Sequence, residues 1–395
     1  MALTMTAGTL ASGLKKCRLV VDRYVTIPML GCVEMRDGKL FATDLDLEIE
    51  IDMPKDGTAD LPLIDFRALA GLARLIDADE PVTLDGTDST DHACASIAFN
   101  GSRYQMPVVT THGKEEREFL PRIGMPEAPM TATGNMGLSA AFRRVAPFIS
   151  SEETRYYLNG VCLSRDRQDR RCLVATDGHR LGWIVVPELE QADHLTSDLI
   201  LPRCLVAALL ALKTEPQGMA LHPDRGGRAQ FTWPGMRLAS KLIDGAYPDW
   251  KRVVPDFSDG ALVYDMPRGP VLAALKRLLA VGRATSGSFH VYIKLQFGGE
   301  GLRLQSRTGD NLLLEEKIAT EGWEHPACIY LNGNYLTEAL RAFTGADTVC
   351  MNFRPSDLEN TTNTCDGPVL LTAEGDPLHV VQMPLTSRKV RWGDE

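Results

Sequence analysis

Three segments of the chain share one pattern of apolar and basic residues. Each places apolar side chains on one stripe of a 3.6-residue period and two adjacent basic residues on the opposite side, which predicts an amphipathic helix. The segments are LASGLKKCRLVV from Leu10, LSAAFRRVAPFI from Leu138 and PVLAALKRLLAVG from Pro270. Their basic pairs are Lys15 and Lys16, Arg143 and Arg144, and Lys276 and Arg277. Successive pairs lie about 130 residues apart, which indicates an internal repeat.

A second set of helix-like segments recurs in the same order, beginning at Asp65, Pro202 and Asn332. Between the two helices of each repeat lie alternating, strand-like runs at 39–52, 171–186 and 302–318. We therefore expect an α+β protein made of three copies of one domain, each with two helices and antiparallel strands. The predicted domains are residues 1–130, 131–257 and 258–395, the last with an extra tail at about 386–395.

Composition limits the classes of function. A chain of 395 residues with 44% hydrophobic and 24% charged residues is typical of a globular protein with several domains. It has no long apolar run that would predict a membrane span and no secretory signal, and its nine cysteines are scattered singly, so we expect a cytoplasmic protein with reduced thiols. The net charge of −10 argues against a protein that wraps nucleic acid with its whole surface.

The basic pairs change that picture locally. A basic pair on one amphipathic helix usually marks a solvated face, but three equivalent pairs in an acidic chain are harder to explain in that way. If the three domains are arranged by a common operation, the pairs converge on one positive surface. Such a surface suits phosphate contacts that do not read sequence.

The stretch VATDGHRLGW places Asp177, His179 and Arg180 around Gly178 and resembles the residue set of a catalytic site. Asp-Gly between two strand-like runs is also a strong hairpin signal, because Gly tolerates positive φ. The chain has no Gly-x-Ser-x-Gly elbow, no paired-histidine metal motif and no Gly-rich phosphate loop to complete a catalytic site. We therefore predict a turn that presents side chains, with no catalytic residue, metal or cofactor. A DNA-end enzyme that uses Asp44 and Asp46 with a divalent metal is the alternative from another class.

Four motifs carry a resemblance to a known family: TRYYLNGVCL from Thr154, VATDGHRL from Val174, SKLIDGAYPDWKRVVP from Ser240 and VVQMPL from Val380. In order and spacing they resemble the bacterial DNA polymerase III beta subunit, the sliding clamp, and the resemblance covers the whole chain. It implies a homodimeric ring that encircles double-stranded DNA as a processivity factor. It also implies partners that include the polymerase III alpha subunit, the clamp loader and other proteins with clamp-binding motifs.

The same resemblance implies a peptide-binding pocket between the middle and last domains. Carried over by motif, its residues are Arg155, Tyr157, Leu158, Thr176, Gly178, His179, Arg180, Leu181, Pro248, Arg252, Val253, Val381, Met383, Pro384 and Leu385. The basic pairs are implied to face DNA together with Tyr156 and Arg203, and Tyr104 and Val281 are the candidates for the dimer interface. A specialised or degenerate clamp paralogue, which binds clamp partners without serving as the principal replication clamp, remains the alternative. The tail after Leu385 is expected to be either an unstructured end or a tethered competitor for the pocket.

Overall fold

The computed structural model contains the same order of elements three times. It describes residues 2–21, 26–53, 61–87, 94–109, 119–124, 132–133, 137–189, 197–223, 227–257, 261–286, 291–307, 312–354, 364–365 and 367–385. Each repeat runs strand, helix, four strands, helix, three strands, and the third adds one short strand before its last two, so the predicted α+β repeat is confirmed. The domain boundaries at 130 and 257 stay a prediction, since they fall between the repeats without being marked by an element.

The first repeat consists of β1 (Ala2–Thr6), α1 (Ala7–Cys17), β2 (Cys32–Arg36), β3 (Lys39–Thr43), β4 (Leu47–Asp52), β5 (Leu63–Asp65), α2 (Phe66–Ala73), β6 (Pro81–Thr87), β7 (Cys94–Phe99) and β8 (Ser102–Met106), with the short β9 (Val108–Val109) after it. The second consists of β10 (Ala132–Thr133), α3 (Leu138–Val145), β11 (Gly160–Arg165), β12 (Arg171–Thr176), β13 (Arg180–Val185), β14 (Leu199–Pro202), α4 (Arg203–Leu212), β15 (Gly218–His222), β16 (Arg228–Trp233) and β17 (Met236–Lys241). The third consists of β18 (Leu262–Pro267), α5 (Arg268–Ser286), β19 (Tyr292–Gly298), β20 (Gly301–Arg307), β21 (Leu313–Ile318), β22 (Ala327–Asn332), α6 (Gly333–Ala342), β23 (Thr348–Phe353), β24 (Thr364–Cys365), β25 (Val369–Thr372) and β26 (Leu378–Gln382).

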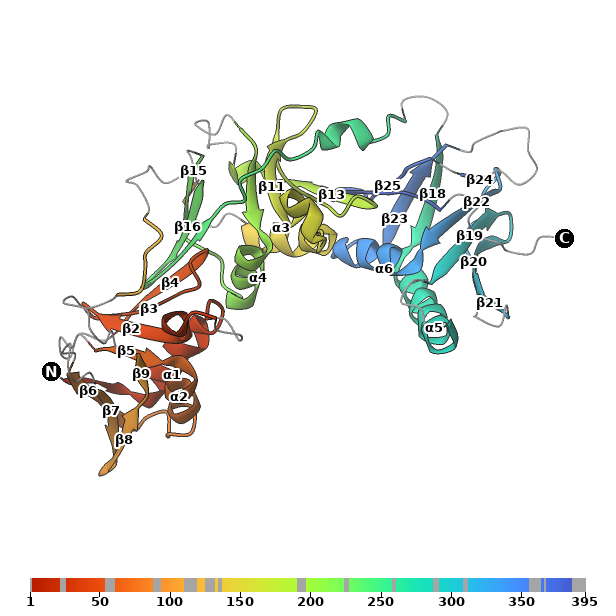
Figure 1. Cartoon of the computed structure of the whole chain (residues 1–395). Coiled ribbons are helices and arrows are strands. Elements are labelled where there is room, and N and C mark those ends of the chain that lie inside the picture. Colours follow the sequence, from red (N-terminus) through yellow and green to blue (C-terminus); the bar gives the residue numbers. More distant parts are fainter. Residues whose placement is uncertain are drawn as a thin grey trace. The chain divides into compact units, whose positions relative to one another are not determined.

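The chain divides into two compact units (Figure 1). Unit 1 comprises Met1–Ser139 and Gln191–Asp244, and unit 2 comprises Ala140–Glu190 and Gly245–Glu395. The second repeat is therefore shared between them. Its strands β15, β16 and β17 belong to unit 1, and its strands β11, β12 and β13 belong to unit 2.

One kind of strand pairing joins repeats within each unit. In unit 1 the last strand of the second repeat, β17, pairs antiparallel with β4 of the first. In unit 2 the last strand of the third repeat, β26, pairs antiparallel with β13 of the second. In both cases the last strand of one repeat extends the sheet of the repeat before it, so the sheets continue across the repeats.

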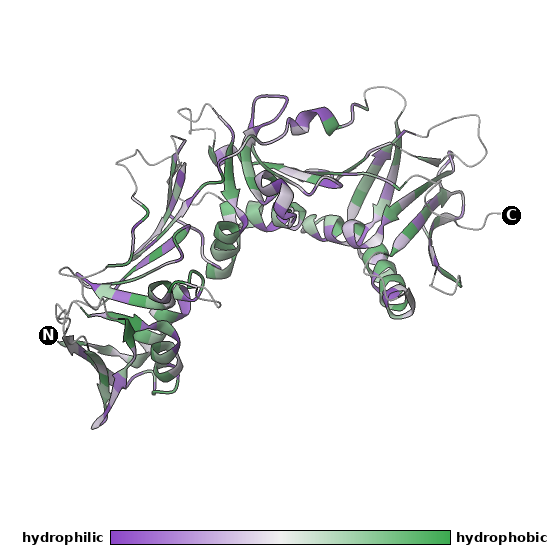
Figure 2. Cartoon of the chain, viewed as in Figure 1, coloured by the Kyte–Doolittle hydropathy of each residue, from purple (hydrophilic) through white to green (hydrophobic). Residues whose placement is uncertain are grey.

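The helices form on the pattern that the sequence predicts, and they cover the sheets. Leu10 and Leu14 of α1 are buried, and α1 packs on β3, β4 and α2. In unit 2, α5 packs on β20, β21 and α6 (Figure 1). Asp65 and Asn332 cap α2 and α6 by accepting hydrogen bonds from backbone N–H groups of the first turn. Polar and apolar residues are interspersed along the chain in Figure 2. Burial alternates along β16 and β19, as expected for strands with one face on the core, whereas β12 and β22 are buried along their whole length.

The helices differ in length more than the sequence pattern indicates. The three basic-pair helices have 11, 8 and 19 residues. The second one is short because Pro147 follows it and the chain turns into a 3₁₀ segment, Ala146–Phe148. No helix within the described ranges is long and apolar enough to span a membrane.

The backbone of β13 passes close to the ring of Phe148 in unit 2, and this contact allows the packing to be tested. The position of a Cβ added at Gly182 on β13 overlaps the ring of Phe148, which is fully buried. We expect Gly182→Ala to lower the free energy of unfolding by about 1–3 kcal/mol, because the ring has to shift in a close-packed core. The measurement is urea unfolding followed by circular dichroism.

Gly71→Ala is the matched control. Gly71 lies in α2, and a Cβ there has no neighbour within 4 Å. Alanine is the better helix former, so this variant should be neutral or more stable by up to about 1 kcal/mol. Equal stability of the two variants would contradict the packing argument.

Candidate functional sites

The turn between β12 and β13 is built by its own side chains. Asp177 accepts hydrogen bonds from the backbone N–H groups of His179 and Arg180, at 2.9 and 3.1 Å. The hydroxyl of Thr176 accepts from the N–H of Gly178 at 3.1 Å and donates to the carbonyl of Arg180 at 2.7 Å. Gly178 has φ +86°, a conformation that side chains disfavour. The predicted hairpin turn is confirmed.

Arg180 is committed to structural contacts. Its side chain is buried, with its guanidinium 3.0 Å from the carboxylate of Asp177 and 2.6 Å from that of Glu338 on α6. It also donates to the carbonyl of Pro147 at 2.8 Å and lies over the ring of Tyr335 at 4.3 Å. The arginine therefore ties the turn to α6 of the third repeat, and its charge is balanced by two carboxylates.

Beside this turn lies an apolar pocket of about 270 Å³, formed entirely by unit 2. Its walls come from the 3₁₀ helix Glu153–Leu158, from the turn and the start of β13, from the segment around the 3₁₀ helix Trp250–Val253, and from β26 with the residue after it. Leu181 and Val381 are partners in the pairing of β13 with β26, so the strand pair that joins the repeats also forms the pocket wall. The lining residues are Arg155, Tyr157, Leu158, Thr176, Gly178, Arg180, Leu181, Pro248, Asp249, Trp250, Val253, Val381 and Met383.

Four residues that were predicted for the pocket lie outside its lining. His179 is exposed and stacks on Tyr335, with ring centroids 6.1 Å apart, and Arg252 is exposed on its 3₁₀ helix. Pro384 is half-buried. Leu385 packs on Cys328 and Tyr330 instead, because its N–H donates to the carbonyl of Tyr330 at 2.8 Å and draws the chain away.

Two lining residues, Asp249 and Trp250, were not predicted. Trp250 is buried, packs against Trp183 with the two rings tilted by 44°, and donates its indole N–H to the hydroxyl of Ser164 at 3.2 Å. The tryptophan itself was a signal in the sequence, since its large apolar ring is usually packed against other residues and its N–H usually finds a partner.

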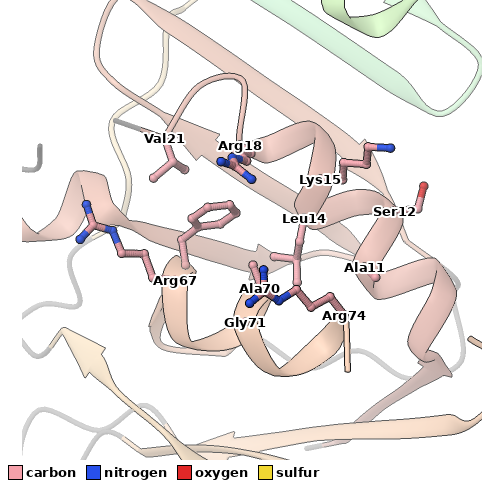
Figure 3. A pocket seen from close by; sticks show the side chains of 11 residues that line it. Ala11, Ser12, Leu14, Lys15, Arg18, Val21, Arg67, Ala70, Gly71 and Arg74 are labelled. Carbon is pink, nitrogen blue, oxygen red and sulfur yellow. The ribbon is translucent and has the colours of Figure 1, made fainter. Parts of the chain in front are cut away.

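A second hollow of about 780 Å³ lies between α1 and α2 in unit 1 (Figure 3). Leu14, Val21, Phe66 and Ala70 supply apolar surface. Its cations are Lys15 and Arg18 from α1 and its C-terminal end, and Arg67 and Arg74 from α2 and its C-terminal end. All four cationic side chains are exposed, and no acidic residue is among the lining residues. This groove is a local concentration of positive charge in an acidic chain, and its α2 cations were not predicted.

The basic pairs do not behave as pairs. In each helix the first member, Lys15, Arg143 or Lys276, is exposed. The second member lies about 100° further round the helix and meets different surroundings. Lys16 is half-buried, and Arg277 is exposed but joined to Glu316 on β21 at 2.7 Å.

Arg144 departs from the prediction altogether. Its guanidinium forms an ion pair with Asp376 in which both side chains are largely buried, and it donates to the carbonyl of Ala342 at 2.8 Å. An arginine held in this way is not available for phosphate, so Arg144 is removed from the set of DNA contacts. The other two residues predicted to face DNA, Tyr156 and Arg203, are exposed.

Asp44 and Asp46, the candidates for a metal site in the alternative prediction, are engaged in other contacts. Asp44 accepts hydrogen bonds from the N–H groups of Asp46 and Leu47, at 3.0 and 2.7 Å, and so shapes the turn between β3 and β4. Asp46 pairs with Lys241 at 3.1 Å. Burial raises the pKa of Asp44 above its ordinary value. Among the described residues, no three His, Cys, Asp or Glu side chains are grouped to hold a metal ion.

Comparisons with known proteins agree with this architecture. Residues 135–249 match the family model of the DNA polymerase III beta subunit, central domain. The beta sliding clamp of Caulobacter vibrioides is 28% identical over 382 residues, covering 93% of this chain and 96% of the relative. That of Pseudomonas putida is 26% identical over 343 residues, covering 82% of this chain and 86% of the relative.

Solved structures show the same fold. A crystal structure of the beta sliding clamp of C. crescentus matches with a TM-score of 0.81 at 25% identity, covering 98% of both chains. The DNA polymerase III subunit beta of Pseudomonas aeruginosa matches with a TM-score of 0.81 at 22% identity, covering 98% of this chain and 100% of that one. Repeat architecture, motif order, the family model and relatives of similar length agree: along its length the chain is similar to the bacterial DNA polymerase III beta subunit, and residues 135–249 match the central domain of that family.

Proposed function

We propose that this protein is a DNA sliding clamp, a non-catalytic processivity factor that closes around duplex DNA in the cytoplasm and tethers polymerases through the unit 2 pocket. The observation that carries the ring is the pairing of repeats through their sheet edges. The last strand of the second repeat, β17, pairs with β4 of the first repeat, and the last strand of the third, β26, pairs with β13 of the second. By the same rule β8, the last strand of the first repeat, requires the strand equivalent to β4 in a third repeat, which is β21.

Both of those strands end their sheets. In the first repeat one sheet has the strand order β1-β6-β7-β8, and in the third repeat one sheet has the order β21-β20-β19-β22-β24. An unpaired strand edge is a template for pairing with another chain. Pairing β8 of one copy with β21 of a second is a heterologous contact, and two such contacts close a ring of two chains. This supports the predicted homodimer, first repeat against third.

Side-chain positions are compatible with that contact. Tyr104 on β8 is 47% exposed and stacks on Phe99 with centroids 5.6 Å apart. Leu313 on β21 and Val281 on α5 are 50% and 44% exposed. Both strands also carry charged residues of opposite sign, Arg103 on β8 and Glu315 on β21. Aromatic, aliphatic and opposite-charge partners are the pairs that stabilise adjacent strands.

The DNA face is proposed from the exposed cations of the helices. Lys15, Arg143 and Lys276 occupy equivalent places in the three repeats, and the groove between α1 and α2 adds Arg18, Arg67 and Arg74. A ring retains DNA by topology, so a few sequence-independent phosphate contacts suffice.

The proposed partners at the pocket are the polymerase III alpha subunit, the clamp loader and other proteins with short apolar motifs. A Bartonella birtlesii clamp bound to griselimycin, 23% identical with a TM-score of 0.79, supplies a chemical probe for ligand binding by this fold.

Topological retention is the direct test of the function. The protein is placed on nicked circular DNA by a clamp loader from a Caulobacter relative, separated from free protein by gel filtration, and the DNA is then cut once. We expect the protein to elute with the circle and to be absent from the linear product, because a ring slides off an end. Retention after cutting would contradict a ring. Failure to be retained on the circle by a protein that binds clamp partners would favour the paralogue alternative.

Dimer closure is tested at the sheet edge. Tyr104→Glu places a charge at the centre of the proposed interface and should convert a dimer into a 43.4 kDa monomer in sedimentation velocity at micromolar concentration. Tyr156→Glu, at a tyrosine that is 53% exposed on the 3₁₀ helix before β11, should leave the dimer intact. A wild-type protein that stays monomeric at all concentrations would refute the interface.

The DNA face is tested by neutralising the first residue of each basic pair. Lys15→Gln, Arg143→Gln and Lys276→Gln should each weaken DNA binding and lower the slope of log K against log salt by about 0.9 for every phosphate group that the variant no longer neutralises. Lys241→Gln is the control and should leave the slope unchanged, because it removes an exposed cation at the end of β17 that is paired with Asp46. If the slope were unchanged in the three test variants as well as in the control, the basic residues would be ordinary solvated side chains that do not contact DNA.

The pocket is tested with two exposed valines. Val253 lines the pocket and is 52% exposed, whereas Val263 on β18 is 53% exposed and lies outside it. Val253→Glu buries a charge under an apolar ligand and should weaken griselimycin binding by at least about tenfold, and Val263→Glu should not. Equal affinities in isothermal titration calorimetry would place the ligand elsewhere.

A further inference from the structure

Arg155 lies across one end of the unit 2 pocket. It is a lining residue, and a Cβ added at Gly178 would collide with its guanidinium, so the arginine rests directly on the glycine of the turn. Its backbone departs from the 3₁₀ conformation of its neighbours, with φ −112° and ψ 52°. The chain geometry therefore directs this cation toward the pocket instead of continuing the helix.

Glu152 holds the arginine in that position. The Nε of Arg155 donates to Oε2 of Glu152 at 2.7 Å, Nη2 donates to the same oxygen, and the hydroxyl of Thr154 donates to Oε1 at 3.1 Å. The hydrogen bond with Arg155 holds the pKa of Glu152 below its ordinary value. Both partners are partly exposed, at 37% for Arg155 and 48% for Glu152. Exposed pairs of this kind are weak, and another carboxylate can replace one partner.

The other charges at the pocket are arranged differently. Arg180, the second cation of the lining, is buried and balanced by Asp177 and Glu338. Asp177 is in turn occupied by backbone N–H groups and Arg180. Asp249, an exposed acid, is also in the lining and disfavours a second carboxylate beside it. Arg155 therefore differs from Arg180 in being itself partly exposed and in having a carboxylate partner that an incoming ligand can displace.

We propose that Glu152 is an internal competitor for Arg155, which the carboxylate of a bound peptide displaces. The ligand's carboxylate replaces that of Glu152 on the guanidinium while its apolar side chains fill the space between Leu181, Pro248 and Val381. A charged, planar guanidinium favours such an exchange, because it binds any carboxylate in the same geometry. This inference rests on the proposed role of the pocket as a peptide-binding site.

The test compares matched peptides on matched variants of the full-length protein. The probes are fluorescein-labelled hexapeptides with two positions that are Leu or Phe and one neighbouring position that is Asp or Asn. The measured quantity is the ratio of Kd for the Asn peptide to Kd for the Asp peptide, by fluorescence anisotropy. We expect the wild-type protein to prefer Asp, and Glu152→Gln to increase that preference about twofold to fivefold, the range that corresponds to an exposed ion pair.

Two further variants separate competition from general charge effects. Glu153→Gln removes an equal charge from the adjacent, exposed position and should leave the ratio unchanged. Arg155→Gln should bring the ratio to about one while the Asn peptide keeps its affinity. Equal changes for Asp and Asn peptides in Glu152→Gln, or peptide binding with no preference for Asp, would overturn the competition. Absence of binding by every peptide and by griselimycin would overturn the peptide pocket itself.

Discussion

The antiparallel pairing of one repeat's last strand with the sheet of the repeat before it is the contact on which the rest of the structure depends. It is a backbone interaction, so it requires strand edges of matching length more than particular side chains. The β4–β17 pairing makes unit 1 continuous, and the β13–β26 pairing makes unit 2 continuous. The same rule leaves β8 and β21 at sheet ends in the chain. A strand at the end of a sheet is a template for pairing with another chain, and this is the basis of the proposed ring.

The pocket proposed to bind peptides is a consequence of the same pairing. Leu181 and Val381 face the pocket because they are opposite one another in the β13–β26 register. Arg180 then fixes the junction by linking the turn to Glu338 on α6. Strand pairing thus brings the second and third repeats together, and ion pairs of Arg180 hold the turn of the second repeat against α6 of the third. The remaining apolar surface is the proposed binding site for a partner.

The sequence predicted what is local and periodic, and missed what depends on distant partners. Helical phase identified the buried stripe of α1 and the exposure of Lys15, because both follow from the 3.6-residue period. Phase could not show that Arg144 meets Asp376, which lies 232 positions further along the chain. In the same way the C-terminal motif could not show that Met383 lines the cavity whereas Leu385 lies outside its lining, with its N–H bonded to the carbonyl of Tyr330.

The acid, base and cation of the turn therefore have roles that differ from those of a catalytic set. The carboxylate of Asp177 is occupied by two N–H groups and a guanidinium, and Arg180 is occupied by two carboxylates and a carbonyl. His179 stacks on Tyr335 and lies outside the pocket lining. A catalytic group has to be free to exchange a proton or a bond with a substrate. Here the polar residues hold a tight turn against a neighbouring repeat, and recognition passes to the apolar wall beside it and to Arg155, whose partner is exposed enough to be replaced.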